Sequence, residues 1–252
     1  MIQFLLRCDD LGYSEAVNYG IEKALRFGMA KSTGMMPNMP AAAHGFALVR
    51  NLPICVGQHT NICVGPPVCD PRDIPSLVQA NGAFKPSRAY RAAEEDIVVL
   101  EEAVREIEAQ YQRFKELTGR EPAYFEGHAV RSANFDIALE LVAKRHGLKY
   151  SGMVRPGQTM PVGTGQAYRC AVDSMNPDYD AVESLQKAVQ EARTDMPNLY
   201  VCHPGYVDDY LLRTSSLTLN RAKEAEMLSE PSVRAWLEEQ QVELVSYDDI
   251  GN

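Results

Sequence analysis

Short apolar runs alternate with segments of helical periodicity along almost the whole chain. The first run, residues 2–8, precedes a stretch between Ser14 and Gly28 whose apolar residues recur every three or four positions. Because helical crossovers between short buried strands favour parallel pairing, the pattern predicts a mostly parallel sheet with right-handed connections. We expect strands at residues 2–8, 32–36, 54–58, 123–126, 148–154, 199–202 and 242–246. We expect helices at residues 14–28, 41–51, 93–117, 134–146, 179–192, 219–228 and 232–240.

This alternation is compatible with two α/β architectures. The chain has 252 residues and no Ser/Gly/Pro-rich linker, so we expect a single domain spanning residues 1–252. A (β/α) barrel commonly needs about 250 residues, but a doubly wound sheet would satisfy the same pattern. The first strand is followed by Asp9, Asp10, Leu11 and Gly12 in place of a glycine-rich phosphate loop. Nucleotide binding therefore lacks its usual sequence support.

Charge and cysteine content narrow the range of partners. The 25 basic and 34 acidic residues give a net charge of −9 without a Lys/Arg cluster, so nucleic acid is not expected as a partner. The six cysteines have no CxxC spacing, which is typical of reduced thiols. No apolar run approaches the roughly 20 residues of a bilayer span, and Arg7 interrupts the first run too early for a signal peptide. We expect a cytoplasmic protein without a membrane partner, and a homodimer is left open.

Polar residues lie where several predicted strands end. Asp9 and Asp10 end the first strand, and His59, His128 and His203 follow later ones. In a parallel barrel the carboxyl ends of the strands converge on one mouth, which is where such enzymes carry their catalytic groups. The other two histidines, His44 and His146, fall inside predicted helices, where a surface or capping role is expected.

One carboxylate and two imidazoles on converging strands are suited to a divalent metal ion with an open coordination position. We expect Asp10, His59 and His128 to be the ligands and Zn²⁺ to be the ion. Mg²⁺ is the alternative, because a hydrated, oxygen-rich site also holds it. Taken singly, each residue has a simpler structural interpretation, as a turn cap or a hydrogen-bonded loop histidine. Their joint placement favours metal binding.

An ordered set of sequence blocks resembles the YdjC/ChbG-like carbohydrate deacetylase family. Any one block is weak, but the ordered set covers most of the chain. The blocks include Cys8-Asp9-Asp10-Leu11-Gly12-Tyr13, Met36-Pro37-Asn38, Gly57-Gln58-His59-Thr60-Asn61, Glu126-Gly127-His128, Arg155-Pro156, Cys202-His203-Pro204-Gly205-Tyr206, and Ser215-Ser216-Leu217 with Arg221 and Glu224.

The resemblance implies a barrel-like (β/α) fold, possibly distorted or seven-stranded, and metal-dependent removal of an acetyl group from an N-acetylated sugar, typically a chitooligosaccharide. It also implies metal ligation by Asp10, His59 and His128, a general base at Asp9, and a proton donor at His203. The chain departs from the family where a frequent Asp-Gly-His-Gln-His block reads Glu126-Gly127-His128-Ala129-Val130, and where Gln58 replaces the usual hydrophobic residue. The second histidine of this block is absent, and the range of sugars accepted depends on whether that histidine shapes sugar binding.

Amide hydrolysis explains why these residue types are suitable. A bound metal ion would activate a water for attack on the acetyl carbonyl, Asp9 would take up its proton, and His203 would protonate the leaving amine. Adjacent strand residues point to opposite faces, so Asp9 and Asp10 share a site only if the backbone turns, which Gly12 would permit. Asp9 is equally suited to orienting a ligand histidine, and His203 to a structural role before the Pro204-Gly205 turn.

Arg155 is a further candidate, either orienting Asp9 or binding substrate oxygens, although a strand-end arginine is more often a surface ion-pair partner. Two other functions stay open. One is a barrel that binds a sugar or metabolite without hydrolysing it, and the other is a metal-dependent hydrolase of a different amide or ester.

Overall fold

The computed structural model describes residues 1–251, and the predicted domain boundary at Asn252 lies outside them. The strands are β1 (Ile2–Leu11), β2 (Ser32–Met35), β3 (Cys55–Thr60), β4 (Tyr124–Gly127), β5 (Lys149–Tyr150), β6 (Thr159–Val162), β7 (Gly165–Arg169), β8 (Asn198–Cys202) and β9 (Val242–Val245). The helices are α1 (Glu15–Arg26), α2 (Ala42–Val49), α3 (Ser87–Ala92), α4 (Leu100–Thr118), α5 (Ala133–Arg145), α6 (Ala181–Gln190), α7 (Asp209–Thr214), α8 (Leu219–Ser229) and α9 (Pro231–Glu239), with 3₁₀ turns η1 (Pro71–Asp73) and η2 (Tyr247–Asp249).

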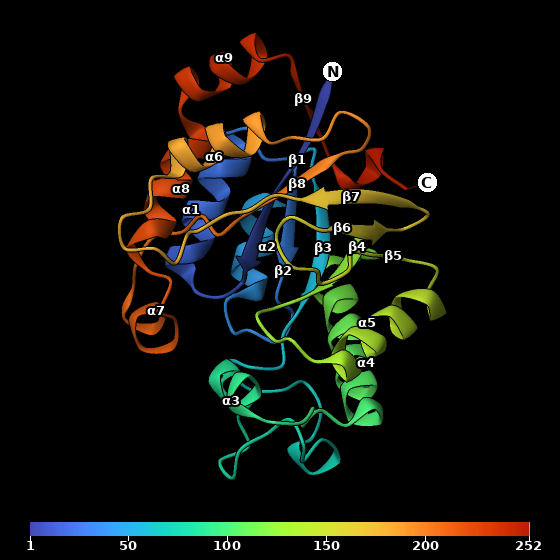
Figure 1. The fold of residues 1–252 in the computed structure, drawn as a ribbon. Coiled ribbons are helices and arrows are strands. Elements are labelled where there is room, and N and C mark those ends of the chain that lie inside the picture. Colours follow the sequence, from blue (N-terminus) through green and yellow to red (C-terminus); the bar gives the residue numbers. More distant parts are fainter. Residues whose placement is uncertain (252) are drawn as a thin grey trace.

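The strands form one sheet in the order β5-β4-β3-β2-β1-β8-β7-β6, and β9 pairs with the N-terminal part of β1. The pairing is parallel except between β6 and β7. The two ends of this order meet, because Ser151 after β5 forms an antiparallel bridge with Val162 of β6. The sheet is therefore a nearly closed barrel with helical crossovers (Figure 1), which confirms the barrel-like α/β prediction over the doubly wound sheet.

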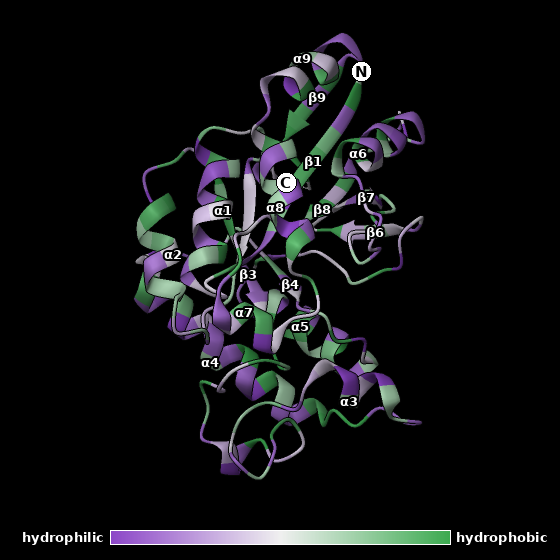
Figure 2. Cartoon of the chain, turned by 90° about the vertical axis from the view of Figure 1, so that its left-hand side faces the viewer, coloured by the Kyte–Doolittle hydropathy of each residue, from purple (hydrophilic) through white to green (hydrophobic). Residues whose placement is uncertain are grey.

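Side chains on the strands alternate between the barrel interior and the surrounding helices. Leu5 of β1 packs with Tyr124 and Leu199 inside the barrel, whereas Phe4 and Leu6 belong to the apolar layer that includes α1 and α8. Strands β1 and β9 show green, apolar segments in Figure 2, and the helices carry both apolar and hydrophilic residues. The alternation puts Arg7 and Asp9, which follow Leu5 at two-residue steps, on the interior side of β1.

Local sequence signals explain where several helices begin and end. Ser14 caps α1 by accepting a hydrogen bond from the Val17 backbone N–H, and Ser132 caps α5 by accepting one from Phe135. Helix α4 ends at Gly119, whose φ of 70° is in the left-handed region. All three helices were predicted, at residues 14–28, 93–117 and 134–146.

Three parts of the chain differ from the predicted elements. Helix α4 begins at Leu100 instead of residue 93, because Asp96 accepts hydrogen bonds from the Ser132 hydroxyl and the Asn134 backbone N–H instead of entering the helix. The strand expected at 148–154 is reduced to β5, and the antiparallel β6–β7 hairpin was not predicted. The short helices α3 and α7 were also missed.

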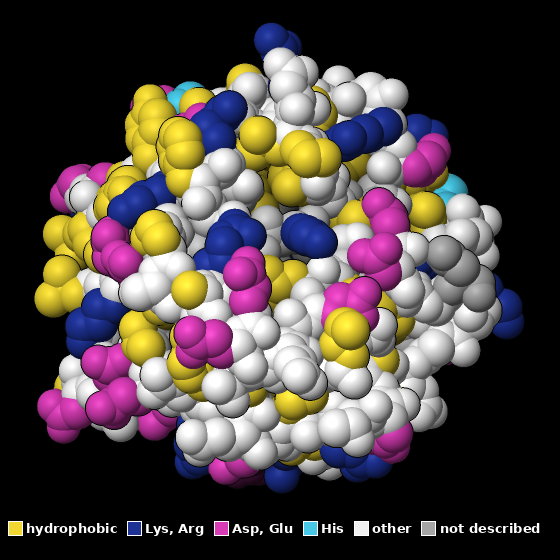
Figure 3. All heavy atoms as spheres, turned by 90° about the horizontal axis from the view of Figure 1, so that it is seen from above, with side chains coloured by type: hydrophobic (Ala, Val, Ile, Leu, Met, Phe, Trp, Pro, Cys, Tyr) yellow, Lys and Arg dark blue, Asp and Glu magenta, His cyan; other side chains and the backbone are white. Residues whose placement is uncertain are grey.

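The two ends of the barrel differ in character. Helices α3 and α7 lie beyond the carboxyl ends of the central strands (Figure 1). At the opposite end, seen from above in Figure 3, acidic and basic side chains are interspersed with apolar ones. In the described part of the chain, no helix has the length and apolar character required to cross a bilayer.

Candidate metal centre and active site

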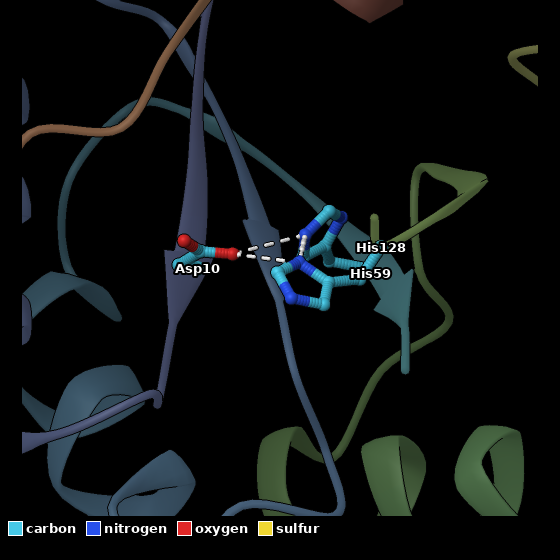
Figure 4. A group of neighbouring side chains, drawn as sticks. All are labelled: Asp10, His59 and His128. Atoms are coloured by element: carbon cyan, nitrogen blue, oxygen red, sulfur yellow. Dashed lines mark hydrogen bonds and ion pairs between the residues drawn. The ribbon is translucent and has the colours of Figure 1, made fainter. Parts of the chain in front are cut away.

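Three of the predicted site residues meet at the mouth of the barrel. Asp10 lies near the end of β1, His59 near the end of β3, and His128 directly after β4. The His59 Nε2 atom lies 3.1 Å from Asp10 Oδ1 and 2.8 Å from His128 Nδ1, and His128 Nδ1 lies 3.1 Å from the same Asp10 oxygen. Figure 4 shows the three side chains pointing toward one another from separate segments. Asp10 and His59 are buried, and His128 is 14% exposed through its side chain.

The backbone turns at Asp10, which allows adjacent carboxylates to share this region. On a regular strand Asp9 and Asp10 would point to opposite faces. Asp10 has a φ of 76°, and the pairing of β1 with β2 shifts register between Cys8 and Leu11, so the strand bulges here. Gly12, where we predicted the turn, also has a positive φ of 100°, but the change of direction already occurs at Asp10.

The chemistry of these atoms fits a divalent cation. His59 Nδ1 lies 2.5 Å from Glu126 Oε1; because a carboxylate accepts, Nδ1 carries a proton, and in the neutral ring that binds a metal the Nε2 lone pair faces Asp10 and His128. Electron pairs packed this closely repel one another unless a positive charge lies among them. Their separations are close to those of neighbouring ligands on an ion about 2.0–2.1 Å from each. A carboxylate bound to the outer nitrogen of a ligand histidine is the usual support of such a site.

The pKa shifts within the cluster also favour a bound cation. Burial alone would lower the pKa of His128, but the interactions with Asp10 and Cys63 together outweigh burial and raise it to about 9. Burial also opposes the charged form of Asp10, yet Arg221 and His128 hold the pKa of that carboxyl well below its ordinary value. The cluster thus stabilises an anionic Asp10 and attracts positive charge.

A buried arginine that we did not predict binds the carboxylates on the interior side. Arg7 donates to both oxygens of Asp9, from Nε at 2.7 Å and from Nη2 at 2.8 Å. The same Nη2 lies 3.4 Å from Glu126 Oε2. Asp9, His59 and Glu126 therefore form a second group of close polar atoms, with Arg7 supplying its positive charge. The sequence signal was Arg7 itself, a charged residue inside an otherwise apolar strand.

Arg155 is not brought to this group. Its side chain is exposed and borders a separate hollow with Asp136 and Gln158. The guanidinium that orients Asp9 is that of Arg7, and the one that binds Asp10 is that of Arg221. Both are buried, whereas sequence reasoning considered only the strand-end arginine.

Helix α8 connects the metal-ligand candidates to His203. Arg221 Nη2 donates to Asp10 Oδ2 at 2.7 Å, which leaves Oδ1 facing the two histidines. Arg221 Nη1 also donates to the His203 carbonyl at 3.5 Å. One helical turn later, Glu224 accepts a hydrogen bond from the His203 backbone N–H at 2.5 Å and another from Tyr179 at 3.0 Å. Both Arg221 and Glu224 belong to one of the sequence blocks, but no role was predicted for them.

His203 lies beside the cluster, directly after β8, and borders the same spaces as His128. Its Nδ1 atom is buried without a hydrogen-bond partner among the described residues. Burial lowers the pKa of His203 to about 4, although Asp10 and Asp9 oppose the shift. The ring is therefore neutral at pH 7.

Two spaces meet at the cluster. The inner chamber, of about 280 Å³, is bordered by Arg7, Asp9, Glu126 and Arg169 inside the barrel. The outer cleft, of about 690 Å³, is bordered by Asp10, Tyr13, Arg88 and Met175. His128, Ala129 and His203 border both, so the candidate site lies at the junction of a small interior space and a larger surface cleft.

The chain is similar over its whole length to proteins of known family. It is 30% identical to carbohydrate deacetylase 2 of Listeria innocua serovar 6a, with 99% of each chain covered, and 32% identical to the carbohydrate deacetylase of Geobacillus stearothermophilus, with 96% of each covered. A crystal structure from Enterococcus faecalis V583, of a protein proposed to cleave cellobiose phosphate, superposes with a TM-score of 0.82 at 21% identity, covering 100% of this chain and 99% of the other.

A family model also matches, and it extends over nearly all of the barrel. This match and the two relatives confirm the resemblance drawn from the ordered sequence blocks. Residues 3–239 match the model of the YdjC-like proteins, and the chain belongs to that family.

Proposed function

We propose that this protein is a metal-dependent hydrolase that removes an acetyl group from an N-acetylated sugar, with a chitooligosaccharide as the expected substrate. The observation that carries the proposal is the meeting of Asp10, His59 and His128 within 3.1 Å, beside Asp9 and His203. The names of the two relatives, both carbohydrate deacetylases, support the same activity.

Asp10, His59 and His128 would hold the metal ion, with Zn²⁺ as the expected ion and Mg²⁺ as the alternative. When bound there, a divalent cation lowers the pKa of water and polarises the acetyl carbonyl. Glu126 fixes the His59 ring through Nδ1, and Arg221 fixes Asp10 through Oδ2. The ligand atoms are therefore preorganised, so little reorganisation is needed on binding.

Asp9 would act as the general base. Both of its oxygens are bound by Arg7, which fixes the carboxylate on the interior side of His59. A positioned base of this kind contributes about 10²- to 10⁴-fold to the rate. We propose that Asp9 takes a proton from the attacking water.

His203 would protonate the departing amine. Because the ring is neutral at rest, His203 would first receive the proton that Asp9 takes from the attacking water and would then pass it to the departing nitrogen. The hydrogen bond from its backbone N–H to Glu224 holds His203 at the junction of the inner chamber and the outer cleft. This is where the sugar nitrogen would lie if the sugar occupies the larger cleft.

The test is acetate release from N,N′-diacetylchitobiose by purified protein, before and after treatment with a chelator. We expect release that stops when metal is removed and returns when Zn²⁺ is added back. Release that is unaffected by a chelator able to strip the protein of metal would contradict the proposal. Release from other amides or esters alone would point to the broader hydrolase alternative.

A barrel that binds a sugar without hydrolysing it is the second candidate. It is favoured by Ala129 and Val130, which stand where the family frequently has Gln and His. Val130 is apolar and buried, so unlike a histidine it cannot hydrogen-bond to a substrate. Sugar binding without acetate release from the metal-loaded protein would support this candidate.

A further inference from the structure

The inner chamber contains more positive than negative charge. Arg7, Arg131 and Arg169 border it, against two carboxylates, those of Asp9 and Glu126. With the histidines counted as neutral, the chamber has a net charge of +1 before any cation is bound. A divalent ion at the cluster would add to this excess, so the loaded chamber favours an anionic occupant.

Of the three arginines that border the chamber, Arg7 is paired with Asp9 and Arg131 is exposed. Arg169 is partly buried, and its side chain has no hydrogen-bond or ion-pair partner among the described residues. Arg7 binds Asp9 through two hydrogen bonds and lies 3.4 Å from Glu126 Oε2, an oxygen that has no hydrogen-bond partner among the described residues. The Arg169 side chain has no hydrogen bond or ion pair among residues 1–251, although it lies at the end of β7 and is mostly screened from solvent. Burial and the nearby Arg7 both lower the pKa of Arg169. A partly desolvated guanidinium without an acceptor is unfavourable.

A second polar atom at the chamber also lacks a partner. His203 Nδ1 is buried and makes no hydrogen bond among the described residues. Arg169 comes from β7 and His203 from the segment after β8, the neighbouring strand, so both reach the chamber from the same side of the barrel. An acceptor placed in the chamber could satisfy both groups.

The size of the chamber decides what kind of acceptor fits. Its volume of about 280 Å³ corresponds to roughly nine waters at about 30 Å³ each. An acetyl group, with three non-hydrogen atoms, leaves most of that space unfilled. The proposed function puts the sugar in the outer cleft and therefore the acyl group in the chamber.

We propose that the inner chamber is a carboxylate-binding site in which Arg169 is the anchoring cation. A carboxylate can reach it from two sources. One is acetate held after hydrolysis, and the other is the terminal carboxylate of an acyl group longer than acetyl, such as an N-succinyl group. This inference rests on the proposed function for the origin of the carboxylate, but not for its binding.

The binding is tested by titrating the metal-loaded protein with ¹³C-labelled acetate, followed by NMR. We expect Arg169→Gln to weaken acetate binding on the order of 10- to 100-fold, the usual value of a hydrogen bond to a charged group, and Arg169→Lys to restore part of it. Arg88→Gln removes the same charge from the outer cleft and should bind acetate like the parent protein. Equal affinity in the parent, Arg169→Gln and Arg88→Gln would overturn the proposal, as would no detectable binding to the parent.

The source of the carboxylate is tested by comparing N-acetyl and N-succinyl forms of the same amino sugar. The rate of hydrolysis of each form is compared between the parent and Arg169→Gln. A loss at least 10-fold larger for the succinyl form than for the acetyl form would identify the carboxylate of the acyl group as the ligand. Arg169-dependent acetate binding without succinyl hydrolysis would identify the product. Arg169-dependent acetate binding by a protein that hydrolyses neither form would contradict the proposed function while leaving the carboxylate site intact.

Discussion

At the mouth of the barrel, the surrounding side chains determine the charge of Asp10 and of His203. Asp10 adopts a positive φ that non-glycine residues rarely adopt, and its two oxygens serve different partners. Strain of this kind usually persists where the surrounding structure imposes it, often at functional sites. His203 differs from Asp10, because its ring is neutral and its Nδ1 atom has no hydrogen-bond partner among the described residues.

The pKa of His203 makes a prediction about acid stability. A histidine whose pKa is lowered to about 4 in the folded protein resists protonation there, whereas in the unfolded chain it binds a proton near pH 6.5. Its contribution to the free energy of unfolding is therefore lost as the pH falls from about 6.5 toward 4, by up to about 3 kcal/mol. We expect His203→Gln to lose less stability than the parent over this range in denaturant titrations of metal-free protein. Parallel pH profiles would contradict the assignment.

Among the elements, α8 is the one that ties the metal-ligand candidates to the proton donor. Its first turns supply Arg221 to Asp10 and Glu224 to the backbone of His203, and both side chains are fully or almost fully buried. The helix therefore fixes two groups that come from strands β1 and β8, which are neighbours in the barrel.

This arrangement predicts that Arg221 controls metal affinity without being a ligand. Arg221→Met leaves Asp10 Oδ2 buried without its partner, and we expect metal affinity to fall 10- to 100-fold, with a loss of about 3–5 kcal/mol in stability. Arg221→Lys should recover part of the affinity because it keeps the charge. The measurement is calorimetric titration of Zn²⁺ into metal-free protein.

The matched control is Arg213→Met, which removes an exposed arginine paired with Asp209 on the rim of the cleft. This variant should bind Zn²⁺ like the parent. If Arg221→Met also kept the parent affinity, α8 would have no role in organising the ligands.

For the whole molecule, the sequence predicted the alternation of strands and helices and the convergence of Asp10, His59 and His128. Periodicity and strand ends suffice for both, since parallel strands place their carboxyl ends together. The β6–β7 hairpin could not be predicted, because its short strands do not follow the βα alternation. Arg7, Arg221 and Glu224 were missed because their partners are distant in sequence and become neighbours only when the barrel forms.

We propose that three strand ends of this barrel hold one metal ion. The most direct measurement is the metal content of purified His59→Ala, His128→Ala and His203→Ala, with Asp9→Asn as a further control and circular dichroism to check folding. We predict that the first two lose bound metal, and that His203→Ala and Asp9→Asn keep it while losing acetate release. Equal metal content in all four variants would contradict the claim.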